Sequence, residues 1–132
     1  MTIEVGWENE EKTILIERFD GAWTWEEFYA AIQQAASMMA EVEHRVDVLA
    51  DMIKADRPPS GTAMTHARNM MRLYPDNWGI MVIVANNLLI TTSVNMFRRL
   101  FRANLGKKIH TAKTVEEAYV LIAEQIKNAT SS

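Results

Sequence analysis

The 132-residue chain contains no cysteine, which excludes disulfides, thiolate metal sites and a cysteine nucleophile. Basic charge is not in excess either, because 14 Lys and Arg stand against 17 Asp and Glu, for a net charge of -3. A general nucleic-acid binder normally carries a basic field, so we expect no nucleic-acid partner. No apolar stretch approaches the roughly 20 residues that cross a bilayer, and the acidic start lacks a signal-peptide core. We therefore expect a cytoplasmic protein without an integral membrane segment.

Motifs for catalysis and for cofactors are also missing. With only five glycines, the chain has neither a G-x-G-x-x-G fingerprint nor a Walker lysine. His44, His66 and His110 are scattered and lack zinc-ligand spacing. A triad of Ser60, His110 and Asp51 has no nucleophile-elbow sequence around the serine. The sequence predicts no catalytic residue, no metal and no cofactor, and hence a protein that is not an enzyme.

What the chain does contain is a regular alternation of strands and helices. Segments 46–53 and 79–85 read as buried strands, because both are short, apolar and free of polar alternation. Each leads into a helical pattern, which is typical of a sheet with parallel strands. We expect a single α/β domain over residues 1–132, with a mixed four- to five-stranded sheet, about four helices and a frayed tail at 128–132. Segments 46–53 and 79–85 should be central and parallel.

The first part of the chain predicts a hairpin followed by a helix. Segments 3–7 and 13–19 favour strands, and the polar turn between them indicates an antiparallel pair. Asp20-Gly21 should end the second strand. Thr24 is followed three residues later by Glu27, which is the spacing of a capping box at a helix start.

The second half of the chain predicts three more helices and a short strand. One helix begins at Ser60, which is placed as its N-cap, and another covers about 91–104. A short strand covers 108–111. Thr114 and Glu117 form a second capping box. The helix that they begin is expected to bury one face, formed by Val115, Ala118, Tyr119, Ile122 and Ile126.

The carboxyl edge of the sheet is the first candidate site, because open α/β sheets bind ligands there. Polar residues end the two central strands, and two predicted helix starts would aim free N–H groups at the same edge. Such an edge favours a small anion such as a phosphate or a carboxylate. The alternative is that these residues are ordinary N-caps and a turn. The candidate binding residues are Asp51, Asp56, Ser60, Gly61, Asn86, Asn87, Thr91 and Thr92.

Two further groups of residues are candidates for binding. A basic cluster on the later helices suits an acidic or phosphorylated partner, or is the solvated side of those helices. Its members are Arg98, Arg99, Arg102, Lys107 and Lys108, with Arg68 and Arg72 nearby. Nine methionines suit an adaptable apolar pocket, or simply fill the core. Those expected in helices are Met38, Met39, Met64, Met70, Met71 and Met96.

The element order β-β-α-β-α-β-α-β-α, with these lengths, resembles the STAS domain family, which includes the bacterial anti-sigma-factor antagonists. Its SpoIIAA-like subset of small stand-alone proteins is the most similar. Segment 46–52 resembles the central strand of the family, which closes on an Asp, here Asp51. Ser60-Gly61 stands about where the Asp-Ser-x-Gly switch of the family opens the second helix, and segments 99–106 and 114–118 resemble its last two helices. Pro59 replaces the family's Asp, so we expect Ser60 to be an N-cap rather than a phosphorylated switch.

The resemblance implies a STAS/SpoIIAA-like fold and a non-enzymatic regulatory or protein-interaction domain. A protein partner would bind at the Ser60 helix start and the 86–93 loop. The alternative function is a small-molecule-binding module, for an anion or for an apolar ligand between the helices and the sheet. The sequence leaves a homodimer open.

Overall fold

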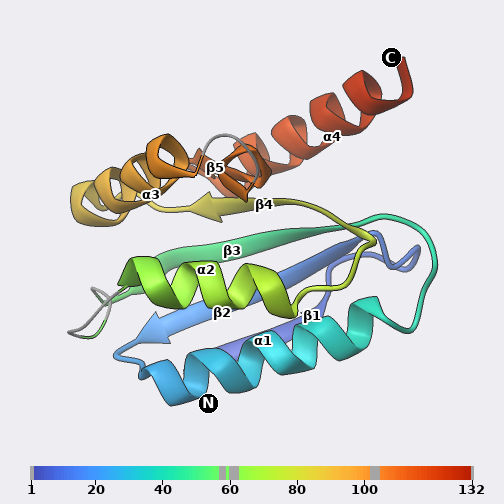
Figure 1. Cartoon of the computed structure of the whole chain (residues 1–132). Helices are drawn as coiled ribbons and strands as arrows, with labels where there is room; N and C mark the ends of the chain where they lie inside the picture. The colour runs from blue at the N-terminus through green and yellow to red at the C-terminus, as the bar shows by residue number, and fades with distance from the viewer. Residues whose placement is uncertain (1, 57–58, 60–62, 102–104, 132) are drawn as a thin grey trace.

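The computed structural model of the chain describes residues 2–56, 59, 63–101 and 105–131. A five-stranded sheet lies at its centre, with the strands side by side in chain order (Figure 1). The strands are β1 (Ile3–Trp7), β2 (Ile14–Gly21), β3 (Val46–Ala55), β4 (Trp78–Val84) and β5 (Ile109–Ala112). The helices are α1 (Trp25–Met39), α2 (Ala63–Leu73), α3 (Leu88–Leu100), the 3-10 helix η1 (Leu105–Lys108) and α4 (Val115–Ser131).

The sheet is mixed, as the sequence predicts. Strand β1 pairs with β2 in the antiparallel sense, and β2 to β5 are all parallel. Each parallel step goes from one strand to its immediate neighbour in the same direction, and such crossovers are nearly always right-handed. Successive right-handed crossovers in one direction place their helices on one face. This is where α1, α2 and α3 lie, and α4, which follows the last strand, covers the other face.

The two faces of the sheet each contribute to a hydrophobic core. Val48 of β3 belongs to the core beneath α1, α2 and α3, while Val82 of β4 belongs to the core beneath α4. Both side chains have 0% exposure. The prediction that 46–53 and 79–85 form parallel, buried strands inside the sheet is therefore confirmed. None of the described helices has the length and apolar character needed to cross a membrane.

Both predicted helix starts with a Thr-x-x-Glu pattern are present. In α1, Thr24 Oγ1 accepts from the backbone N–H of Glu27 at 3.1 Å, and the Glu27 carboxylate accepts from the backbone N–H of Thr24 at 3.1 Å. In α4, Thr114 Oγ1 accepts from Glu117 N at 3.1 Å, but the Glu117 carboxylate accepts from Lys113 N instead. At the start of α4, the Glu117 carboxylate thus satisfies the amide of Lys113, one residue before Thr114, instead of the amide of Thr114 itself.

Helix α3 begins at Leu88, three residues before the predicted start, and ends at Leu100, before the predicted end at 104. The reason for the early start is Asn87, which has extended backbone angles and whose side-chain oxygen accepts from Leu89 N at 2.8 Å. Asn87 is therefore the N-cap rather than part of a turn. The predicted start near Thr91 was wrong, and most of the 86–93 segment is helix rather than loop.

Smaller differences concern strand and helix ends. Strand β2 ends at Gly21, so the prediction that Asp20-Gly21 ends this strand is confirmed, although both residues still pair with β3 after a register shift between Arg18 and Asp20. Helix α4 continues to Ser131, through the segment expected to fray. Its last turns project beyond the sheet (Figure 1), so Ile126 is 38% exposed and the prediction that it points inward was wrong.

Candidate functional site

The structure does not place Asp51 with the start of α3. Strand β3 continues four residues beyond it to Ala55, so Asp51 is not at the strand end. Because Ala50 faces the core beneath α1, α2 and α3, Asp51 points to the opposite face. There it lines a groove with Arg18 and Asp20, and its carboxylate accepts from Ile53 N at 3.2 Å. The prediction that Asp51 ends its strand beside the start of α3 was therefore wrong.

The other candidates fall into two places at the carboxyl edge. Asp56 and Asn87 come together with Leu89 in one open groove. Asn86 and Thr91 line a second groove, between the starts of α3 and α4. Thr92 is exposed in the first turns of α3 and is not an N-cap. Ser60 and Gly61 lie outside the described residues, so the start of the helix that they were expected to open is not part of this description.

The start of α3 is partly occupied by its own N-cap. The Asn87 side chain already occupies Leu89 N, which is one of the amides that a phosphate or carboxylate would use. Among the described residues, no group of three or more His, Asp or Glu side chains is arranged to hold a metal ion. The polar candidates thus form two separate grooves instead of one crevice.

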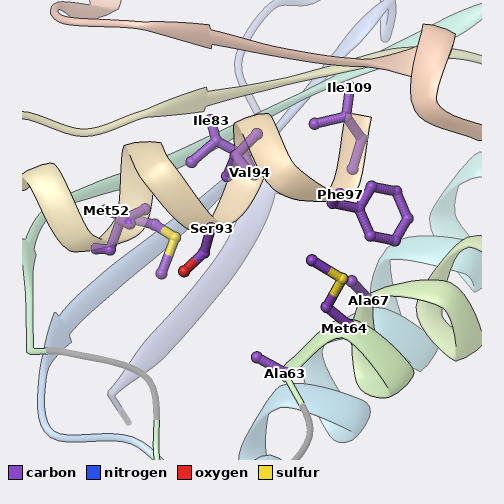
Figure 2. A pocket seen from close by; sticks show the side chains of 10 residues that line it. Met52, Ala63, Met64, Ala67, Ile83, Ser93, Val94, Phe97 and Ile109 are labelled. Atoms are coloured by element: carbon purple, nitrogen blue, oxygen red, sulfur yellow. The ribbon is translucent and has the colours of Figure 1, made fainter. Parts of the chain in front are cut away.

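An apolar cavity lies between α2, α3 and the sheet. It has a volume of about 120 Å³, and Figure 2 shows side chains from both helices facing the same space. Among the described residues that line it, Ser93 alone has a polar side chain, and its hydroxyl donates to Leu89 O at 2.9 Å. The lining residues are Met52, Ala63, Met64, Ala67, Ile83, Ile90, Ser93, Val94, Phe97 and Ile109.

Small side chains on α2 explain why this space is open. Ala63 and Ala67 occupy successive turns of the helix face that looks toward α3, and neither reaches across. Met64 of α2 and Met52 of β3 border the space, and their thioether side chains can change rotamer at low cost. The sequence pointed to methionine in an apolar pocket between helices and sheet, but the two alanines four residues apart were the clearer signal.

Helix α2 is held against α1 by side-chain contacts. The His66 ring stacks on Trp25, with ring centroids 4.2 Å apart, and its Nδ1 lies 2.6 Å from Tyr29 Oη. The Asn69 side-chain amide donates to the same Tyr29 oxygen at 3.3 Å. These contacts tie the first half of α2 to α1, away from α3, so the cavity remains between α2 and α3.

The chain just beyond α2 is anchored by a buried polar pair that sequence reasoning missed. Tyr74 donates from its hydroxyl to the Glu17 carboxylate at 2.7 Å, and Glu17 is only 1% exposed. Burial raises the pKa of Glu17 to about 7, against a smaller lowering from the Tyr74 hydrogen bond. The sequence did contain a signal for this burial. Side chains of a strand alternate between its two faces, so Glu17 lies on the same face as the apolar residues Leu15 and Phe19.

A second buried carboxylate was missed on β3. Asp47 is 1% exposed, and its Oδ1 accepts from Ile80 N at 2.8 Å and pairs with Arg45 at 2.9 Å. The ion pair lies directly against Gly79, where a Cβ would be 2.2 Å from Arg45 Nε and from Asp47 Oδ1. Gly79 is therefore required by close approach, and the cluster is part of the framework of the sheet.

The basic cluster is split between structural and exposed residues. Lys108 donates to Trp78 O at 3.0 Å and its ammonium lies 4.5 Å from the Trp78 ring centroid, and burial is the main cause that lowers its pKa. Arg99 and Lys107 are exposed, while Arg98 is half-buried. Arg102 lies outside the described residues. Lys108 thus supports the fold rather than an exposed basic surface.

Comparison with protein-family models gives no match, and no curated protein matches significantly. Solved structures do match. An uncharacterized protein of the DUF3478 family with a SpoIIAA-like fold, from Shewanella loihica PV-4, is similar with a TM-score of 0.66 and 14% identity, over 90% of this chain and 92% of that chain. The phosphorylated form of SpoIIAA, a cell fate determinant of Bacillus, is similar with a TM-score of 0.55 and 17% identity, over 91% and 98%. The predicted fold is thereby confirmed, and the chain has the SpoIIAA-like fold.

Proposed function

We propose that this protein is a non-catalytic binding domain that takes a small apolar molecule into the cavity between α2 and α3. The observation that carries this proposal is the almost wholly apolar lining, in which the Ser93 hydroxyl already has a partner. An enclosed apolar cavity of about 150 Å³ binds a molecule the size of benzene, and the space between α2 and α3 is of similar size but partly open to solvent. At about 120 Å³, this cavity suits an aromatic ring or the end of an alkyl chain, and it offers no charge for a phosphate or carboxylate.

Titration with toluene tests this function. Toluene should shift the amide NMR signals of α2 and α3 and raise the melting temperature, because a ligand that binds only the folded state stabilises it. Ala67→Leu fills the space and should abolish both responses while leaving the fold as stable as before. Ala123→Leu, on the exposed face of α4, is the matched control and should respond like the natural protein. An unchanged spectrum with toluene, or a full response in Ala67→Leu, would contradict the proposal.

A protein-interaction role of STAS type is the second candidate, because of two leucines at the start of α3. Leu88 is 81% exposed and Leu89 is 52% exposed, so packing in the core does not explain why leucine stands at these two positions. Both lie in the 86–93 segment that the family resemblance indicates as a partner surface. The double change Leu88→Ser/Leu89→Ser should remove a partner captured from the native host, and Leu73→Ser, at the exposed end of α2, should not. Equal capture by all three proteins would count against this candidate.

A further inference from the structure

Strand β5 lies at one edge of the sheet formed by the described residues. Among the described strands it pairs only with β4, so the backbone groups that point the other way have no strand partner. The strand is short, but its four residues, Ile109 to Ala112, include neither proline nor an acidic or permanently basic side chain, which are two of the devices that block such edges. An added chain could therefore hydrogen-bond to β5 as a further strand.

Two grooves meet at this edge. One lies between β5 and α4, has a volume of about 430 Å³, and is lined by Thr111, Ala112, Glu116, Glu117, Val120, Leu121 and Glu124. The other lies between the starts of α3 and α4, has a volume of about 490 Å³, and shares Thr111, Ala112 and Glu117. The side chains of an added strand point alternately to the two faces of the sheet. One set would reach the α4 groove and the other would point toward the start of α3.

The lining of the grooves indicates the chemistry of the occupant. Glu116, Glu117 and Glu124 border the α4 groove, and no lysine or arginine is among its lining residues. Each groove also contains a large apolar side chain in contact with solvent, namely Val120 (58% exposed) and Leu88 (81% exposed). The α4 groove is therefore acidic and complements basic side chains, whereas the second groove contains both Lys113 and Glu117 and exposes Leu88, so it favours apolar side chains.

A second copy of this chain fits the edge less well. Its own β5 would bring a strand with no lysine or arginine, and antiparallel pairing of two β5 strands would place both α4 helices, with their glutamates, on the same face. Like charges brought together in this way oppose association. The charge pattern therefore favours a different protein as the source of the added strand.

We propose that β5 accepts an extended peptide segment with alternating apolar and basic side chains, which adds to the sheet as a sixth strand. The inference is independent of ligand binding in the cavity. It rests on the second candidate function, a protein-interaction role. It specifies that the partner binds at the β5 edge of the sheet and that the bound segment is an extended peptide. Main-chain hydrogen bonds to β5 supply affinity, and the two grooves select the side chains.

Fluorescence anisotropy with a labelled peptide of alternating lysine and valine tests the proposal. The natural protein should bind it, and Glu116→Lys/Glu124→Lys should weaken binding about tenfold, because both exposed glutamates face the basic side chains. Glu10→Lys/Glu11→Lys makes the same charge change in the turn at the opposite edge of the sheet, and should bind within about twofold of the natural protein. A peptide with alternate N-methylated amides should bind as weakly as the double variant, since it cannot pair with β5.

Three results would overturn the proposal. They are no binding of the lysine–valine peptide, equal weakening by both double variants, and equal binding of the N-methylated peptide. The toluene response should be unchanged in Glu116→Lys/Glu124→Lys, which separates this edge from the cavity. If Leu88→Ser/Leu89→Ser removes a protein partner but the peptide does not bind, the interaction surface stands and strand addition at β5 fails.

Discussion

A single buried carboxylate, Glu17, makes stability depend on pH. Its pKa is about 7 in the folded protein, whereas the ordinary value is 4.5, and burial is the main cause. Below about pH 4.5 the group is protonated in both folded and unfolded chains, so it costs nothing. As pH rises toward 7, the unfolded chain ionises first and folding is penalised increasingly. Above pH 7 the penalty is constant, at about 3 kcal/mol for a shift of this size.

Glu17→Gln should therefore stabilise the protein at pH 8 and have much less effect at pH 4.5. The amide oxygen can still accept from the Tyr74 hydroxyl, so the hydrogen bond survives while the charge is removed. Urea denaturation at both pH values measures the difference in the free energy of unfolding. Glu4→Gln, at an exposed position on β1, is the control and should change little. An equal effect of Glu17→Gln at the two pH values would show that the carboxylate does not titrate as described.

At the scale of elements, the beginning of α3 shows how a side chain chooses a helix boundary. Asn87 and Thr91 are both acceptable N-caps by residue type. Starting at Leu88 turns Ile90, Val94 and Phe97 into the core, and the Asn87 side chain satisfies the freed amide of Leu89. The tertiary environment thus selects the earlier of two locally similar starts.

Asn87→Ala should lower the free energy of unfolding by about 1 kcal/mol, because Leu89 N loses its acceptor. Thr92→Ala, at an exposed position in the first turns of α3, should be neutral or slightly stabilising, since alanine is the better helix former there. Chemical denaturation of the two variants gives both values. If Thr92→Ala lowered the free energy of unfolding more than Asn87→Ala does, the helix would begin near Thr91, as the sequence predicted.

Most elements could be predicted from the sequence, because their signals are local. The two Thr-x-x-Glu helix starts and the apolar runs of β3 and β4 needed no long-range information. The cavity was different, because its volume depends on the distance between α2 and α3, which contacts such as Trp25–His66 set. The placement of Asp51 failed because β3 runs on to Ala55, and this length follows from pairing with β2.

At the scale of the whole molecule, one sheet supports two cores that lie on opposite faces. Helices α1, α2 and α3 pack on one face and α4 on the other, and every layer contacts the same three inner strands. We therefore expect the two cores to unfold together, as in a two-state domain of this size.

Val82→Asp tests this coupling, because Val82 is fully buried in the core beneath α4 while the tryptophans Trp23 and Trp78 belong to the other core. An unpaired charge at this position is very costly, so the variant should lose both α4 amide protection in hydrogen exchange and the native tryptophan fluorescence. Val120→Asp, on the exposed side of α4, should keep both signals. A soluble Val82→Asp protein that unfolds cooperatively with native fluorescence would show that the α1–α3 layer folds without α4. The inner strands would then stabilise one face alone, and the assignment of β4 as a strand shared by both cores would be wrong.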